Sequence, residues 1–135
     1  MSTIFKKIID GEIPSVKLYE DDKCISILDI NPNNKGHALV IPKIESETIT
    51  DCPDDILQHI ILIAKKIAAK QIKELNCHGY NILVNNKPAS GQIIPHLHIH
   101  IIPRYDKDGN WFANGFKHHP YAEGEIEEYG QKLKL

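Results

Sequence analysis

The chain has 135 residues, of which 41% are hydrophobic and 25% charged, values typical of a folded domain and unlike those of disordered chains. A chain of this length buries about two thirds of its surface on folding, enough for a core without metal or disulfide crosslinks. Its 16 Lys and Arg against 18 Asp and Glu give a net charge of −2, which argues against broad electrostatic attraction to nucleic acid or membranes.

The first predicted element is a short helix over residues 3–10, with Ser2 as its N-terminal cap and Gly11 as its left-handed exit. The acidic Asp10 follows too soon for the hydrophobic part of a secretory signal peptide. No apolar run in the sequence approaches the roughly 20 residues of a membrane span. We therefore expect a cytoplasmic protein without a membrane anchor.

Strands are predicted next. Residues 16–19 and 24–29 are expected to form a hairpin around the turn at 20–23. A cluster of turn-forming residues occupies 31–36, and a buried strand is expected over 38–41, where Pro42 ends it.

One long helix is predicted over residues 53–75, with Pro53 at its first position. Its buried face is predicted from helical spacing to comprise Ile56, Leu57, Ile60, Ile61, Ala64, Ile67, Ala68, Ile72 and Leu75. His59 on this helix and His78 beyond its end lack partners on the same face, and we interpret both as structural.

The remaining predicted elements are a strand over 80–84, a loop over 85–91 and a last strand over 97–102. The polar segment after Arg104 gives no firm structural prediction. His118 and His119 are expected to be solvated, and the pair Trp111–Phe112 is expected to pack on a partner subunit, on the substrate pocket or on its own sheet. This order favours an α+β fold with an antiparallel sheet and excludes a Rossmann domain, which needs a glycine fingerprint.

The three cysteines, Cys24, Cys52 and Cys77, are odd in number and widely spaced, with no Cys-x-x-Cys pair. This pattern argues against a disulfide framework and against a cysteine-based zinc knuckle. We therefore expect a reduced protein.

Residues 96–102, His-Leu-His-Ile-His-Ile-Ile, are the most informative segment. Alternate residues of a strand face the same side, so His96, His98 and His100 would share one face. Because burying three unpartnered imidazoles is costly, that face is expected to line a polar cleft.

Two chemistries fit three imidazoles on one strand face. Imidazole is a common zinc or iron ligand, but the outer two positions lie about 13 Å apart and do not easily converge on one ion. A metal would therefore use only two of the three. Nucleophilic attack on phosphorus by the central imidazole, with its neighbours stabilising charge on the phosphate oxygens, uses all three and is favoured.

This segment resembles the signature of the histidine triad (HIT) family of nucleotide-binding hydrolases. The segments 29–32 and 36–43 resemble the family's nucleoside-binding strand and turn, and Asn85 with residues 90–92 resembles its phosphate loop. Residues 4–14 are similar to the N-terminal segment of bacterial members. The resemblance covers about residues 3–105, so 1–135 is interpreted as a single HIT domain with a C-terminal tail over 106–135.

The resemblance implies roles for four histidines. His98 would be the nucleophile that forms a nucleotidyl-histidine intermediate, which water then hydrolyses. His100 and His37 would hold the nucleophile and the phosphate in place, and His96 would support the site.

The resemblance also implies a binding site for a purine nucleotide. Asp29 would accept hydrogen bonds from the ribose hydroxyls, since its two oxygens match a vicinal diol. The base would lie between Ile8, Ile27 and Ile30, and the phosphate would contact Asn85, Gly91 and Gln92. Ile93 stands where some relatives place a Ser or Thr that assists the leaving group, which puts that assistance in doubt.

Other departures from the family pattern bear on metals and on reaction type. Many bacterial relatives form a structural zinc site with a Cys-x-x-Cys pair and a later His, positions that here hold Thr3, Lys6 and Glu45. We therefore expect no structural zinc there and no cofactor. The nucleotidyltransferase branch has Gln where this chain has His100, so hydrolysis is favoured over transfer.

Together these residues predict a hydrolase of purine nucleoside phosphoramidates, or of related dinucleoside polyphosphates, that attacks the α-phosphorus and releases AMP. The resemblance implies a homodimer formed through the long helix and the sheet edge. Two alternatives stay open. One is a nucleotide-binding module with little turnover, and the other is a metalloenzyme built on His96 and His98 or on His98 and His100.

Overall fold

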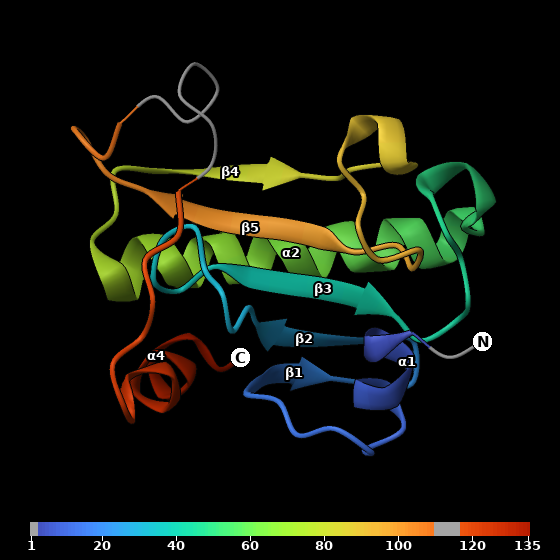
Figure 1. The fold of residues 1–135 in the computed structure, drawn as a ribbon, viewed down its shortest axis with the longest axis horizontal. Helices are drawn as coiled ribbons and strands as arrows, with labels where there is room; N and C mark the ends of the chain where they lie inside the picture. The colour runs from blue at the N-terminus through green and yellow to red at the C-terminus, as the bar shows by residue number, and fades with distance from the viewer. Residues whose placement is uncertain (1–2, 110–116) are drawn as a thin grey trace.

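Five antiparallel strands form a single sheet in the order β1-β2-β3-β5-β4 (Figure 1). The computed structural model describes residues 3–109 and 117–135, so Ser2 and the pair Trp111–Phe112 lie outside the described residues. The strands are β1 (Lys17–Glu20), β2 (Cys24–Leu28), β3 (Ala38–Pro42), β4 (Gly79–Leu83) and β5 (Ile99–Arg104). With the helices described below they confirm the predicted α+β class.

The first three strands follow the predicted hairpins, with bounds that differ by a residue or two. The β2 and β3 strands are buried along their whole length, with Ile25 opposite Ile41 and Ile27 opposite Leu39. Because alternate residues face opposite sides, each strand gives one set of side chains to each face of the sheet.

The helix α2 (Asp54–Leu75) lies across one face of the sheet (Figure 1). Pro53 sits at the N-terminal cap position, one residue before the helix, and Asn76 ends it in the left-handed conformation at a φ of 54°. The main hydrophobic core lies between α2 and the sheet, around Ile60, Ile67 and Ile99.

The buried stripe of α2 differs from the predicted one. Ile61 and Ile72 are 42% and 41% exposed, whereas Ile63 and Gln71 are buried. Gln71 is tolerated there because its side-chain amide donates to the carbonyls of Gly36 and Ile101, both at 3.0 Å. Compared with the prediction, the helix is therefore rotated about its own axis, so that Ile61 and Ile72 lie at one border of its buried face.

The short helix α1 (Ile4–Ile9) covers the opposite face of the sheet. Thr3 caps it, since its hydroxyl accepts a hydrogen bond from the backbone N–H of Lys6 at 3.1 Å. Gly11 leaves the helix at a φ of +79°, as predicted. Phe5 and Ile8 pack in a second apolar cluster against β2 and β3.

The last strand begins and ends two residues later than predicted. Residues 96–98 leave the β3 ladder because the backbone N–H of His96 bonds to Ile94 and that of Leu97 bonds to Ser46. At the other end, β4 continues to pair with β5 as far as Arg104.

The C-terminal tail contains a helix, α4 (Glu125–Leu133), that the sequence pattern did not predict. It packs beside β1 and α2 and buries Leu133 in the main core. Within residues 3–109 and 117–135, none of the helices has the length and apolar character needed to cross a bilayer.

Candidate active site

A cavity of about 450 Å³ opens on the face of the sheet that carries α1. It lies among α1, the end of β2, the start of β3 and the segment leading into β5. Most of the residues predicted for the site line it: Ile8, Ile27, Asp29, Ile30, His37, Asn85, Gly91, Ile93, His98 and His100. Two predicted residues, His96 and Gln92, are not among its lining residues.

His98 stands immediately before β5 with its ring directed by the backbone. Its Nδ1–H donates to the carbonyl of His96 at 2.7 Å, which leaves the Nε2 lone pair uncommitted. The ring of Phe5 packs edge-on against it at 4.8 Å between centroids. Burial lowers the pKa of His98, so the imidazole is neutral near pH 7. A neutral imidazole with a free nitrogen is a competent nucleophile.

His37 and His100 form a hydrogen-bonded pair whose protonation follows from the backbone. The N–H of Asn33 donates to His37 Nδ1 at 3.1 Å, so the ring proton of neutral His37 sits on Nε2. That Nε2–H donates to His100 Nδ1 at 2.9 Å, which places the proton of His100 on Nε2. The pair therefore presents an N–H donor from His100, which lines the cavity.

Burial also keeps both rings of this pair uncharged. It lowers the pKa of His37 to about 3 and that of His100 to about 4, with smaller contributions from neighbouring imidazoles. Both rings of this pair are therefore neutral at physiological pH, and the N–H of His100 can donate a hydrogen bond to an anionic oxygen.

His96 lies beside the cavity. It is 3% exposed, and its Nε2–H donates to the carbonyl of Pro42 at 2.8 Å. Its ring also meets Phe5 edge-on, at 6.2 Å between centroids. His96 thereby joins the segment before β5 to the end of β3, and its own carbonyl fixes His98.

Asp29 follows β2 at the mouth of the cavity. One of its oxygens accepts from the backbone N–H of Asn31 at 2.9 Å, and the other lies 3.8 Å from His37 Nε2. Burial raises the pKa of this carboxyl, with the Asn31 bond acting in the opposite direction. The second oxygen is available to accept from a ligand hydroxyl.

The predicted base-binding side chains form an apolar wall. Ile8 and Ile27 are buried, whereas Ile30 is 77% exposed at the rim. The structure adds lining residues that the sequence analysis missed, mainly Phe5, Ile13, Leu39, Leu83 and Ile94. Only long-range packing brings these residues together, so no local pattern identifies them.

The predicted phosphate loop is held by its own backbone. It contains the 3-10 turn η2 (Pro88–Ser90), and Gly91 leaves it at a φ of +103°, a conformation that favours glycine. Gln92 braces the loop, because its side chain accepts from the N–H of Lys87 at 2.7 Å and donates to the carbonyl of Glu47 at 2.6 Å. Ile93 follows and is 93% exposed.

The tail reaches the site in a way that the sequence analysis did not foresee. His118 is exposed, as expected for a solvated residue, but it also lines the cavity and donates from Nδ1 to the carbonyl of Asn31 at 3.0 Å. The N–H of His119 donates to the carbonyl of Pro32 at 2.9 Å. These bonds tie the tail to the turn that follows Asp29.

Asp29, His37 and His100 also have the chemistry of metal ligands, and their ligand atoms lie within 4.8 Å of one another. An ion bound there would take the place of the hydrogen bond between the two rings, because both nitrogens would need their lone pairs for the metal.

The α+β domain thus holds a cavity in which an apolar wall and a carboxylate lie beside a neutral histidine of fixed orientation. The model of the HIT domain matches residues 10–107, and the chain belongs to the HIT family.

Individual relatives agree with this membership. An uncharacterized HIT-like protein of Methanocaldococcus jannaschii is 50% identical over 106 residues, which cover 78% of this chain and 81% of that protein. The adenosine 5'-monophosphoramidase of Schizosaccharomyces pombe is 36% identical over 98% of this chain and 96% of its own length. A crystal structure of a zinc-bound histidine triad family protein from Mycobacterium smegmatis superposes with a TM-score of 0.86 and 32% identity, covering 99% of this chain and 91% of that one.

Proposed function

We propose that this protein is a nucleotide hydrolase that cleaves purine nucleoside phosphoramidates, or related dinucleoside polyphosphates and nucleotidyl conjugates, at the α-phosphorus. The observation that carries the proposal is the uncommitted Nε2 of His98, a neutral imidazole oriented by a backbone carbonyl and lining the cavity. The adenosine 5'-monophosphoramidase among its relatives supports nucleotide hydrolysis as the general activity.

In the first step, His98 Nε2 attacks the α-phosphorus and forms a phosphorus–nitrogen bond. The bond from phosphorus to the leaving nitrogen or oxygen breaks, and the leaving group takes up a proton from solvent. The N–H that His100 presents donates to a non-bridging phosphate oxygen, which stabilises the charge that develops there. Ile93 has no hydroxyl to assist the leaving group.

In the second step, water attacks the same phosphorus and the bond to His98 breaks. The nucleoside monophosphate is released, a proton from the water passes to solvent, and His98 regains its neutral form. The Nδ1–H bond to His96 persists through both steps and keeps the ring in place.

The nucleoside is held at the other end of the cavity. Asp29 accepts from the ribose hydroxyls, and the base lies against Ile8, Ile27 and Ile30. Asn85 and Gly91 line the cavity on the phosphate side. We assign His96 and Gln92 to positioning, because the ring nitrogen of His96 and both side-chain polar atoms of Gln92 bond to backbone.

The direct test is incubation with an adenosine phosphoramidate and, separately, with a dinucleoside polyphosphate, each with and without chelator. Samples quenched at alkaline pH, because phosphorus–nitrogen bonds are labile in acid, are examined by mass spectrometry for an adenylylated peptide. We expect chelator-resistant release of AMP and an adduct on His98. His98→Ala removes the nucleophile and should abolish turnover, while AMP binding is largely kept.

His78→Ala is the matched control, since His78 lies away from the cavity and its side chain is 54% exposed. Near-normal turnover in His98→Ala would exclude the assigned nucleophile. Saturable AMP binding without release from either substrate would favour the binding module instead. Release that stops with chelator would favour the metalloenzyme.

We also propose that the protein is a homodimer formed through α2 and β4. The described structure ends its sheet at β4, an edge strand with unpaired backbone groups. Exposed apolar side chains accompany this edge and the border of α2: Ile61, Leu62, Ile72, Tyr80 and Ile82. Analytical ultracentrifugation should give twice the chain mass, and Ile82→Lys should shift it toward the monomer. A wild-type monomer at micromolar concentration would contradict the proposal.

A further inference from the structure

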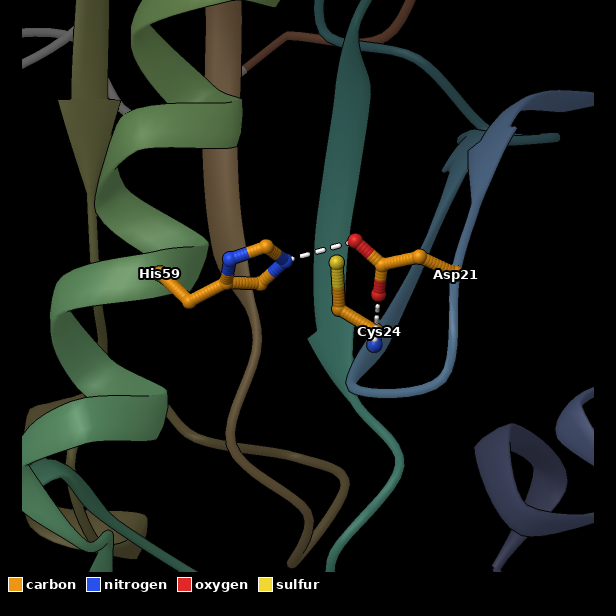
Figure 2. Close-up of side chains that lie close together, drawn as sticks. All are labelled: Asp21, Cys24 and His59. Carbon is orange, nitrogen blue, oxygen red and sulfur yellow. Dashed lines mark hydrogen bonds and ion pairs between the residues drawn. The ribbon is translucent and has the colours of Figure 1, made fainter.

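A second group of side chains with ligand chemistry lies on the α2 side of the sheet, away from the catalytic cavity. Asp21 comes from the turn between β1 and β2, Cys24 begins β2, and His59 projects from α2 (Figure 2). Their carboxylate, thiol and imidazole ligand atoms all lie within 4.8 Å of one another. The β1–β2 turn with the start of β2, and the distant helix α2, thus converge on one point.

Hydrogen-bond donors surround the Asp21 carboxylate. One oxygen accepts from His59 Nε2 at 2.6 Å and from the Tyr19 hydroxyl at 2.8 Å. The other accepts from the backbone N–H groups of Lys23 and Cys24 at 2.8 and 2.9 Å. Burial acts to raise the pKa of Asp21, but these bonds outweigh it and hold the pKa well below its usual range. The carboxylate is therefore ionised and fixed in orientation.

The cysteine supplies the ligand that makes the group selective. Cys24 is fully buried, and its thiol sulfur lies close to the Asp21 carboxylate. Thiolate, imidazole and carboxylate are the three ligand types that proteins use for Zn²⁺. Metal–ligand bonds of 2.0–2.3 Å place the ligands of a tetrahedral ion about 3.5 Å apart, so small side-chain rotations bring this group into range.

We propose that Asp21, Cys24 and His59 form a binding site for Zn²⁺ or a similar divalent transition metal, separate from the active site. On binding, the Cys24 thiol gives its proton to solvent and bonds as thiolate. His59 binds through Nε2 as a neutral imidazole, with its ring proton on Nδ1. Asp21 supplies one carboxylate oxygen, and water completes a four-coordinate site.

Charge and access both bear on the affinity. The side chains of His59 and Asp21 are 27% and 19% exposed, which gives an ion a route from solvent. Burial is the largest cause that raises the pKa of Cys24 to about 12, and the negative charge of Asp21 is the next largest. A metal ion must therefore displace a tightly bound proton from the thiol. Asp22 and Lys43 act on this thiol in opposite directions. Affinity should therefore rise on the order of tenfold per pH unit as the thiol proton is displaced.

A bound ion would connect the β1–β2 turn to α2. The hydrogen bond between Asp21 and His59 makes this connection in the metal-free chain, and metal bonds to both residues would strengthen it. Zinc is thus expected to raise the melting temperature of the protein.

The test is a titration of the reduced wild-type protein with Co²⁺, which gives a thiolate-to-cobalt charge-transfer band only when a cysteine is a ligand. We expect a band at one ion per chain that added Zn²⁺ removes. The cluster of Asp29, His37 and His100 has no sulfur, so an ion there cannot give this signal. Cys24→Ser should abolish the band.

Cys52→Ser and Cys77→Ser are the matched controls, since both cysteines are buried but neither belongs to the group. His59→Gln keeps a donor toward Asp21 and leaves the thiol in place, so it should weaken Co²⁺ binding at least tenfold without unfolding the chain. Absence of the band at millimolar Co²⁺, or its persistence in Cys24→Ser, would overturn the proposal. So would a zinc-dependent rise in melting temperature that His59→Gln leaves unchanged.

Discussion

Two features of its surroundings, burial and the carbonyl of His96, suit His98 to the nucleophilic role proposed for it. Burial lowers its pKa, so the free nitrogen stays unprotonated below the ordinary histidine pKa of about 6.5. We expect kcat/KM to keep its neutral-pH value until the pH falls below about 6.5, since protonation removes the nucleophile. A pH profile of AMP release measures this. An acidic limb centred at or above 6.5 would contradict it, and His78→Ala should leave the profile unchanged.

The ribose role proposed for Asp29 can be tested separately from the chemical step. Its free oxygen lines the cavity, and hydrogen bonds to a charged group contribute about 1.5–3 kcal/mol. Asp29→Ala should therefore weaken AMP binding by roughly 10- to 100-fold but leave the affinity for the 2′,3′-dideoxy analogue nearly unchanged. Isothermal titration calorimetry with both ligands distinguishes these effects. An equal loss for both ligands would remove the ribose role.

Among the secondary-structure elements, the turn between β2 and β3 is held to α2 and to the C-terminal tail by hydrogen bonds of the Gly36 backbone. Its carbonyl accepts from Gln71 on α2, and its N–H donates to the hydroxyl of Tyr121 in the tail, at 2.8 Å. A methyl group added at Gly36 would lie 2.6 Å from Leu75 Cδ1, on a backbone with a φ of +96°. Glycine here permits both the backbone conformation and the close approach of α2.

Gly36→Ala should therefore destabilise the fold by about 2–4 kcal/mol, from backbone strain plus overpacking. Gly11→Ala is the matched control, because Gly11 also has a positive φ but no atom within 4 Å of the added methyl. Strain alone should cost it about 1–2 kcal/mol. Urea unfolding of both variants gives the comparison. Equal losses would show that the contact with Leu75 does not matter.

Local sequence patterns predict many of the elements of this fold. The mainly apolar runs of β2 and β3, which are buried along their whole length, and the helical spacing along α2 follow from the surfaces that these elements bury, and so their positions are predictable. The spacing of the three histidines likewise predicts that His98 and His100 share a face. The pattern does not show that His96 turns its nitrogen to Pro42, because that bond depends on where β3 ends.

Contacts between distant segments were not predictable in this way. The α4 helix packs closely on β1 through Gly130, where an added methyl would lie 2.4 Å from Val16 Cγ1. In the sequence, that glycine looks like a helix breaker in a polar tail. His118 lines the cavity, and His59 hydrogen-bonds to Asp21, only because tertiary packing brings together segments that are distant in the sequence.

For the whole molecule, the two faces of the sheet have different chemistry. The α1 face holds the candidate active-site cavity with the neutral rings of His37, His98 and His100, and the α2 face holds the main core together with the Asp21, Cys24 and His59 group. The buried imidazoles of the first face make folding itself depend on pH. Groups that stay neutral in the fold take up protons when the chain unfolds.

The sign of this dependence follows from the pKa shifts. Folding lowers the pKa of His37 to about 3 and that of His100 to about 4, so in acid the unfolded chain binds more protons than the fold. Their stabilising contribution is complete above about pH 6.5 and is lost as the pH falls to about 4 for His100 and about 3 for His37. Between pH 6.5 and about 4.5, most carboxyl groups keep their charge, which isolates the histidine effect.

In that window, urea unfolding of the wild type should give a free energy of unfolding that decreases as the pH falls. His37→Gln keeps a polar side chain but removes one titrating group, so its slope should be shallower by up to one proton, about 1.4 kcal/mol per pH unit. His78→Gln, at an exposed position, should retain the wild-type slope. If His37→Gln and the wild type have the same slope, His37 is already the charged imidazolium in the fold, and the hydrogen bond assigned from the Asn33 N–H to His37 Nδ1 is wrong.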